Sequence, residues 1–172
     1  MRKLVAILLL FIPLFVLAAG EERYLLDDGD RISIKVYGED DLSMDLLLTA
    51  RGRFDYPYLG RIQAAGKSVG DLQRLIETGL RGDYLIDPKV TVNVIQFRKF
   101  YVNGEVNHPG GYDFQPGLTV GKAIAIAGGF TDRASRNKIQ KTEAKNGNTE
   151  KNVGLSQAVS PGDIIVVEQS FF

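Results

Sequence analysis

Asp27-Asp-Gly-Asp-Arg-Ile-Ser-Ile-Lys-Val-Tyr37 is the most informative stretch of this chain of 172 residues. Aspartate and glycine favour turns, because an aspartate side chain hydrogen-bonds to nearby backbone and glycine adopts a positive φ without strain. After the turn, Ile32, Ile34 and Val36 alternate with polar residues, which predicts a strand with one buried face. The stretch Ser160-Pro-Gly-Asp-Ile-Ile-Val-Val167 repeats this order near the other end. We therefore expect a glycine-aspartate turn to open a strand in each half, a similarity that turn chemistry alone could produce.

Short β-elements follow the first strand. The acidic residues 39–41 are expected to form a solvated loop, because they lack the spacing of a calcium-binding loop. A short strand is predicted at 46–49, and 51–60 is predicted to be an edge segment that enters a turn. Pro57 removes a hydrogen-bond donor there, and Gly60 permits a positive φ.

A helix is predicted from Ser68 onward. The Ser68 hydroxyl can cap the helix, and the Asp71 carboxylate complements the positive end of the helix dipole. Apolar residues recur at helical spacing and give this helix one buried face: Val69, Leu72, Leu75, Ile76 and Leu80. Asp87-Pro88 prevents any continuation, and Val90-Thr-Val-Asn-Val-Ile95 alternates as the next strand.

A second unit is expected to begin near Phe100. Residues 100–106 are strand-like, and Asn107-His-Pro-Gly-Gly111 is a turn. A short helix is predicted at 120–127 and ends at Gly128-Gly129, in the manner of a left-handed C-cap. Asn146-Gly-Asn148 predicts a hairpin tip with a primed turn. The chain is therefore predicted to be α+β, with two small mixed modules.

Composition excludes several classes of protein. Lysine plus arginine and aspartate plus glutamate both total 21, so no basic excess points to nucleic acid. The absence of cysteine excludes thiol catalysis, disulfides and cysteine-ligated metal centres. Since His108 is the one histidine, sites built from several histidines are excluded as well. An apolar fraction of 44% is typical of a chain that folds.

The first twenty residues resemble a secretory signal peptide. Arg2 and Lys3 precede an apolar run at 4–17, and Ala18-Ala-Gly20 offers small residues before Glu21. The run is shorter than the roughly 18–20 residues that a membrane span needs, although an uncleaved anchor is the alternative. No cysteine is available there for lipid attachment. We therefore expect an exported, periplasmic protein without a lipid anchor.

Small size and the lack of disulfides favour assembly. Two modules of about 75 residues would each bury only about 60% of their surface. Contacts between subunits would add burial, and a single core shared by both modules would meet the same need. We expect a homo-oligomer.

No catalytic, cofactor or metal site emerges from the sequence. His108 lies in a proline-glycine turn with no identifiable nucleophile beside it. Gly128-Gly129 follows a helix, whereas the glycines of a phosphate loop precede one. No spacing of acidic residues selects a pair for glycoside hydrolysis.

A polar, aromatic surface for a sugar polymer is a candidate near the middle of the first module. Arg51 lies close to the candidate contacts, which are Arg53, Tyr56, Tyr58 and Arg61. An ordinary strand face with solvated arginines is the alternative.

The order of the motifs resembles a known family. The first half contains Tyr24-Leu-Leu-Asp-Asp-Gly-Asp-Arg-Ile-Ser-Ile-Lys-Val36, Pro57-Tyr-Leu-Gly60, Gly66-Lys-Ser68 and Pro88-Lys-Val-Thr-Val92. These motifs resemble the export domain of Wza-like polysaccharide biosynthesis/export proteins. The second half contains Val102-Asn-Gly-Glu-Val-Asn-His-Pro-Gly110, Ala127-Gly-Gly129 and Pro161-Gly-Asp-Ile-Ile-Val166. These resemble the companion soluble-ligand-binding β-grasp (SLBB) domain.

The resemblance implies an export domain at 21–99 and an SLBB domain at 100–172, after a signal peptide at 1–20. It implies a non-enzymatic chain that forms a ring around a passage for capsule or exopolysaccharide, with an inner-membrane polysaccharide co-polymerase as partner. The positions that match family motifs are expected to set backbone geometry. They are Gly29, Asp30, Pro57, Gly60, Gly104, Pro109, Gly110, Gly128, Gly129, Pro161, Gly162 and Asp163.

This sequence departs from the full-length relatives in several features. It shows no lipidated cysteine, no repeated β-grasp module and no C-terminal amphipathic helix, and it has Arg51-Gly52 where the family tends to have Asp-Gly. We therefore expect the ring to deliver polysaccharide to a separate outer-membrane β-barrel. The alternatives are a monomeric periplasmic β-grasp module that binds a small soluble ligand or glycan, and a hydrolase that acts on the polymer.

Overall fold

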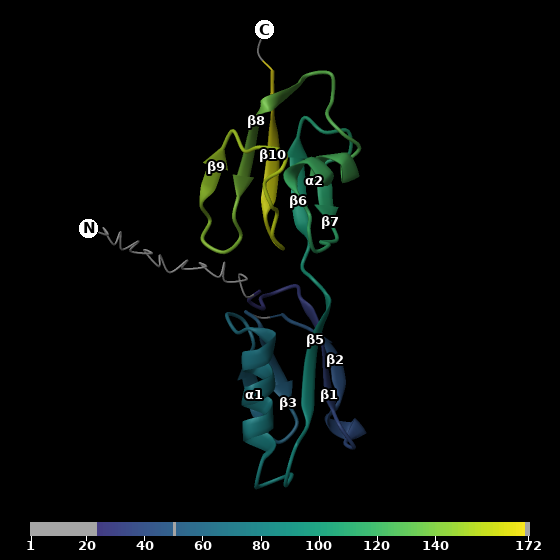
Figure 1. Cartoon of the computed structure of the whole chain (residues 1–172), viewed down its shortest axis with the longest axis vertical. Coiled ribbons are helices and arrows are strands. Elements are labelled where there is room, and N and C mark those ends of the chain that lie inside the picture. Colours follow the sequence, from purple (N-terminus) through teal and green to yellow (C-terminus); the bar gives the residue numbers. More distant parts are fainter. Residues whose placement is uncertain (1–23, 50, 171–172) are drawn as a thin grey trace, which may run out of the picture.

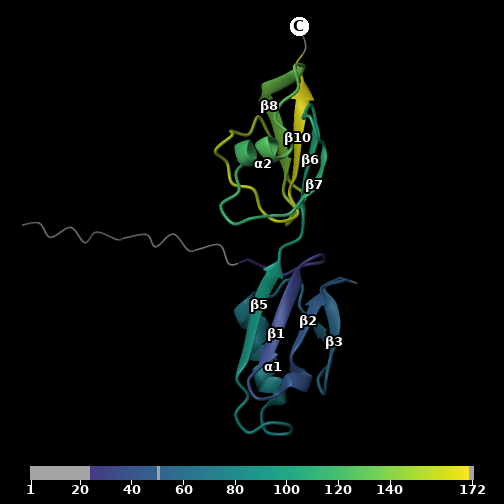
Figure 2. The same cartoon turned by 90° about the vertical axis from the view of Figure 1, so that its right-hand side faces the viewer.

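Two modules lie end to end along the longest axis of the molecule (Figure 1 and Figure 2). The computed structural model describes residues 24–49 and 51–170, so the predicted signal peptide at 1–20 lies outside the described residues. The modules contain antiparallel sheets, one mixed sheet and two α-helices among the described residues, which confirms an α+β chain. The chain passes from one module to the other through a short linker between β5 (Val90–Gln96) and β6 (Phe100–Gly104).

The first module consists of a three-stranded sheet, a separate hairpin and one long helix. In chain order its elements are β1 (Arg31–Val36), the 3-10 helix η1 (Asp40–Leu42), β2 (Met44–Leu47), β3 (Arg53–Tyr56), β4 (Gly60–Gln63), α1 (Val69–Leu80) and β5. β1 lies between β2 and β5 and pairs with both in antiparallel register. β3 and β4 pair with each other. The strands predicted around residues 31–37 and 90–95 are therefore confirmed, and the segment 51–60 forms one arm and the turn of the hairpin.

α1 begins at the cap predicted from the sequence. The Ser68 hydroxyl accepts a hydrogen bond from the Asp71 amide at 3.2 Å and donates one to the Asp71 carboxylate at 2.7 Å. Leu72, Ile76 and Leu80 are fully buried, because residues three or four positions apart share one helix face. This face packs against the three-stranded sheet, where α1 contacts β5.

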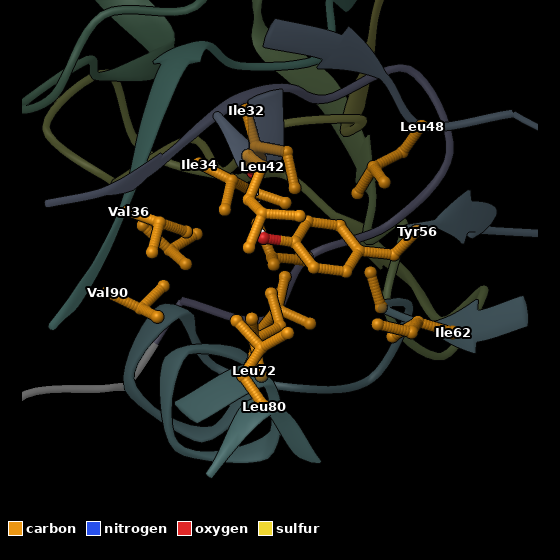
Figure 3. Packing of buried hydrophobic residues seen from close by; sticks show 14 residues of the cluster. Ile32, Ile34, Val36, Leu42, Leu48, Tyr56, Ile62, Leu72, Leu80 and Val90 are labelled. Atoms are coloured by element: carbon orange, nitrogen blue, oxygen red, sulfur yellow. Dashed lines mark hydrogen bonds between the residues drawn. The ribbon is translucent and has the colours of Figure 1, made fainter. Parts of the chain in front are cut away.

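The core of the first module lies between α1, the sheet and the hairpin (Figure 3). Ile32, Ile34 and Val36 from β1 point toward the buried leucines of α1, and the ring of Tyr56 lies in the middle of the cluster. The alternation of apolar residues in β1 therefore does what the sequence predicted: it supplies one buried face.

The second module is a five-stranded mixed sheet with one short helix. Its elements are β6, β7 (Gly110–Tyr112), α2 (Val120–Ile126), β8 (Ala134–Thr142), β9 (Thr149–Lys151) and β10 (Ile164–Gln169). The strand order is β7-β6-β10-β8-β9, with β6 and β10 parallel and the other pairs antiparallel. The first and last strands of the module thus lie side by side at its centre.

α2 ends as the paired glycines predicted. Gly128 and Gly129 both have positive φ, of 83° and 82°. The Gly129 amide donates to the Ile124 carbonyl at 2.9 Å, and the Gly128 amide donates to the Ala125 carbonyl at 3.0 Å. These bonds satisfy carbonyls at the end of the helix, where no further turn is available.

The primed turn predicted at Asn146-Gly-Asn148 is wrong. The strands β8 and β9 last pair at Thr142 and Thr149, so the connection is a longer loop, and only Gly147 of the central residues has a positive φ, of 71°. The Asn146 side chain accepts from the Asn148 amide at 2.8 Å. This local bond holds the loop without the left-handed backbone that a primed turn requires at both central residues.

The two modules have separate cores. The second core gathers β6, α2, β8 and β10, with Phe100, Ile124, Ile139 and Ile165 at most 1% exposed. None of its residues belongs to the cluster around α1. A single shared core, the alternative to assembly considered from the chain's size, is therefore wrong.

Replacing one buried leucine of α1 tests the packing of the first module. Leu72→Ala is expected to lower the free energy of unfolding by about 2–5 kcal/mol, because it leaves a cavity beneath the helix. Leu75→Ala is a matched control on the same helix, since Leu75 is 37% exposed, and should cost less than about 1 kcal/mol. Urea unfolding measures both, and equal losses would contradict the assigned helix face.

Candidate functional site

The β3–β4 hairpin presents a polar face to solvent. Arg53 lies opposite Gln63 and Asp55 lies opposite Arg61, and all four side chains are exposed. The Arg53 Nε donates to the Gln63 side-chain oxygen at 2.8 Å, and the Arg61 Nε donates to the Asp55 carboxylate at 3.2 Å. Guanidinium, amide and carboxylate groups in a row suit hydrogen bonding to the hydroxyls of a glycan. The structure thus brings two predicted contact residues, Arg53 and Arg61, onto one face.

Tyr56 does not share that face. It is 3% exposed, and its hydroxyl donates to the Leu42 carbonyl at 2.8 Å within the core. Successive side chains of a strand alternate in direction, so Tyr56 points to the opposite side of the hairpin from Arg53 and Asp55. Burial raises the pKa of Tyr56 to about 12. The grouping of Tyr56 with the exposed arginines is therefore corrected: its side chain belongs to the core.

Tyr58 lies at the tip of the hairpin beside a residue that the sequence did not single out. Tyr58 has a φ of 65°, which is strained for a residue with a large side chain, and it is 66% exposed. Its ring stacks on Tyr84, with centroids 4.7 Å apart and an angle of 27° between the planes. Tyr84 is itself 46% exposed. An exposed aromatic pair thus stands at the far end of the first module from the linker.

The ionisation of Tyr56 gives a prediction for alkaline stability. The native pKa lies above the ordinary value of 10.0, so the unfolded chain loses this proton first and stability falls as pH rises above that value. Tyr56→Phe removes this contribution, so its free energy of unfolding should fall by about 2–3 kcal/mol less than that of the unaltered protein between about pH 10 and 12. At neutral pH it should cost about 1 kcal/mol, for the lost hydrogen bond. Urea unfolding at each pH measures both effects, and parallel pH profiles of the two proteins would contradict the assignment.

A fully buried carboxylate organises the junction between the modules. Asp30 is 0% exposed and accepts hydrogen bonds from the Tyr24 hydroxyl at 2.6 Å and the Asp27 amide at 2.9 Å. It also accepts from the Arg98 backbone amide at 2.8 Å and from Arg98 Nη1 at 3.2 Å. Burial and the bond to Asp30 both raise the pKa of Tyr24. The family position Asp30 therefore ties the start of β1 to the linker.

Arg98 also lies against the second module. A Cβ atom added at Gly162 would lie 2.9 Å from the Arg98 Nε, and one added at Gly29 would lie 3.1 Å from the Arg98 Cβ. The linker residue before it, Phe97, makes edge-to-face contacts with Tyr24 at 5.0 Å and with Phe114 of the second module at 5.4 Å. Arg98 and Phe97 thus pack between the two modules.

The two glycine-aspartate turns have the same pattern of hydrogen bonds. The Asp163 carboxylate accepts from the Ser160 amide at 2.9 Å, as the Asp30 carboxylate does from the amide three residues before it. The preceding glycines, Gly29 and Gly162, have φ values of 89° and 90°. The similarity predicted from the sequence therefore extends to the geometry of the turns, and Arg98 lies between them.

The remaining family positions lie in turns and close backbone contacts. A Cβ added at Gly104 would lie 2.1 Å from the Val167 carbonyl oxygen, so only glycine lets β6 approach β10 this closely. A Cβ added at Gly128 would lie 2.4 Å from the His108 Nδ1. Pro57 and Gly60 flank the turn at Tyr58, Pro109 and Gly110 lead into β7, and Pro161 is buried before β10. Their geometric role stays a prediction, and Gly110 has neither a positive φ nor a neighbour within 4 Å of an added Cβ.

Removal of the Arg98 guanidinium tests the junction. Arg98→Met leaves the buried Asp30 carboxylate without its cation and should lower the free energy of unfolding by about 2–3 kcal/mol. Arg133→Met is the matched control, because Arg133 pairs with Glu105 at 3.8 Å but is 70% exposed, and it should cost less than about 1 kcal/mol. Chemical unfolding measures both, and equally small losses would show that Asp30 does not depend on Arg98.

Among residues 24–49 and 51–170, no group of three or more histidine, cysteine, aspartate or glutamate side chains is arranged to hold a metal ion. No helix there is both long and apolar enough to cross a membrane.

Comparison with known proteins identifies the class of this chain. Residues 18–95 match the family of polysaccharide biosynthesis/export proteins, and residues 99–151 match the SLBB domain. The chain therefore contains an export-family region followed by an SLBB region, in the order that its motifs predicted. β10, the central strand of the second sheet, lies beyond the matched residues.

Individual relatives carry names from polysaccharide export. The chain is 33% identical over 93 residues to the exopolysaccharide production protein ExoF of Rhizobium meliloti, which covers 52% of this chain and 22% of that protein. It is 32% identical over 136 residues to the EPS I polysaccharide export outer membrane protein EpsA of Ralstonia nicotianae, covering 72% and 35%. It is 29% identical over 91 residues to the polysialic acid transport protein KpsD of Escherichia coli, covering 52% and 16%. The matches thus span about a third or less of each relative.

Proposed function

We propose that this chain is a non-enzymatic, periplasmic component of a machine that exports capsule or exopolysaccharide. It forms a homo-oligomeric ring that conducts the polymer from an inner-membrane polysaccharide co-polymerase toward a separate outer-membrane protein. The observation that carries this proposal is the export-family region followed by an SLBB region in one chain. The names of the relatives, which include polysaccharide export and polysialic acid transport, agree with it.

We further propose that the first module is the export domain, at 21–99, and the second the SLBB β-grasp domain, at 100–172. The separate cores support this division. The position of β10 supports a second domain that extends to residue 172. This strand lies between β6 and β8, so the sheet would be divided without it.

The proposed mechanism is confinement of a hydrated polymer, with no covalent bond made or broken. Polar side chains such as Arg53, Arg61 and Gln63, together with the exposed ring of Tyr58, offer hydrogen bonds and an aromatic face to a passing glycan. Each contact is at an exposed site and therefore weak, as conduction requires, since a polymer must leave each site as readily as it enters. The packed linker would hold the domains of every subunit in one orientation.

Assembly and export are the tests of this proposal. Light scattering of the purified protein, over a range of concentrations and with its envelope partners added, should reveal a large closed species. Deletion of the gene should abolish or strongly reduce surface polysaccharide, and the intact gene should restore it. A protein that stays monomeric under all these conditions, in cells whose surface polysaccharide is normal after deletion, would contradict the proposal. A monomer that binds a small soluble ligand or glycan would instead support the alternative of a β-grasp binding module.

A further inference from the structure

A groove runs along α1 on the outside of the first module. It has a volume of about 700 Å³ and lies between α1 and β4. Its apolar lining includes Leu59, Ile62 and Leu75, and Leu59 packs so closely on α1 that a Cβ added at Gly79 would lie 2.9 Å from its methyl carbons. A volume of this size is within the range of ligand sites in proteins. Gly79 therefore lets the hairpin close one end of the groove.

Basic side chains outnumber acidic ones around this groove. Arg61, Lys67 and Arg74 line it, and Asp71 is the one carboxylate among the lining residues. Arg61 pairs with Asp55 at 3.2 Å and Arg74 pairs with Asp71, whereas neither of these ion pairs includes Lys67. The two arginines are thus positioned by carboxylates, and the groove as a whole carries a positive excess.

The stacked tyrosines lie next to the closed end of the groove. Leu59 follows Tyr58 directly in the chain, and the Tyr84 amide donates to the Leu80 carbonyl at the end of α1, at 3.3 Å. The Tyr84 hydroxyl donates to the Tyr58 carbonyl at 3.4 Å, which joins the two segments. α1 is about 18 Å long, so the groove leads from Lys67, just before the first turn, past Arg74 to an exposed aromatic pair at the other end of the helix.

We infer that this groove and the Tyr58–Tyr84 pair form a binding site for an anionic oligosaccharide segment, one that carries carboxylate groups. The inference rests on the proposed function and adds a class of polymer to it. Lys67 and Arg74 bind the carboxylates through charge-assisted hydrogen bonds, while a sugar ring packs its C–H face on the tyrosine rings. Arg53 and Asp55 of the polar hairpin face lie outside the groove, whereas Arg61 and Gln63 contribute to both.

An acidic protein segment would match the same charges, and η1 of a second copy is the obvious example, because Asp40 and Asp41 are exposed. The aromatic pair favours the saccharide. Aspartates on a short helix would use the basic groups but would leave Tyr58 and Tyr84, which are 66% and 46% exposed, without a contact to the bound segment. A uronic-acid segment uses both features.

Calorimetric titration of the purified full chain tests the inference. The probes are a hexasaccharide of uronic acids, the neutral maltohexaose, and free glucuronate. The uronic-acid hexasaccharide should bind more tightly than either of the others, and its binding should weaken as salt is added. Lys67→Gln with Arg74→Gln should weaken it about tenfold, as expected for the loss of charge-assisted bonds. Tyr84→Leu should weaken it severalfold without removing its salt dependence.

The matched control is Lys145→Gln with Lys151→Gln, which removes the same charge from exposed positions of the second module and should leave binding unchanged. Tyr58→Asn is a second variant that removes one ring of the tyrosine pair. It tolerates the positive φ, since asparagine adopts this backbone conformation more readily than most residues. Unchanged circular dichroism and unfolding midpoints will show that each variant is folded.

Three results would overturn the inference. One is the absence of binding, or an equal affinity for the neutral hexasaccharide. Another is an equal loss of affinity for the uronic-acid hexasaccharide in the groove variants and in the control. A third is a change in the light-scattering mass of the groove variants with no change in their affinity for the hexasaccharide. That result would show that the groove is a contact between copies of the chain. Because ring assembly and export are measured separately, a failed titration leaves the proposed export function standing.

Discussion

The structure depends most on the hydrogen bonds made to the buried carboxylate of Asp30. It is withdrawn completely from solvent, so its charge must be met by hydrogen bonds from within the protein. Tyr24, Asp27 and Arg98 supply them, and these residues come from the start of the first module, from the turn before β1 and from the linker. The same arginine packs against Gly162 of the second turn. One carboxylate therefore connects the turn before β1 with the linker, 68 residues further along the chain.

This junction bears directly on how a chain with two small cores could perform the proposed export function. Each core alone belongs to a module of modest size, and the linker between them contains only three residues outside the strands β5 and β6. Packing of Phe97 and Arg98 between the modules restricts their rotation about that linker. Surfaces on the first module, such as the polar hairpin face and the basic groove, then keep a fixed direction relative to the second module. Repeated copies of such a unit are suited to a regular assembly.

Local patterns in the sequence predicted much of this fold. The alternation in β1, the Ser68 cap and the glycines after α2 each depend on neighbours within a few residues, and each is confirmed. Tyr56 was placed on the wrong face, although its two-residue spacing from Phe54 contained the signal that both point toward the core. The pairing of Tyr58 with Tyr84, and the contact of Arg98 with both turns, join segments 26 or more residues apart. No local period encodes such contacts, so only the folded chain reveals them.

The fixed orientation of the two modules is the central claim, and a distance measurement tests it most directly. The chain has no native cysteine, so Asp83→Cys in the first module and Asn148→Cys in the second would carry the only two spin labels. Dilution with unlabelled protein would suppress distances between copies. Pulsed electron paramagnetic resonance should give a single narrow distance distribution, which should broaden when Arg98 is replaced by methionine. A distribution that is broad or has several maxima in the otherwise unaltered chain would contradict the account.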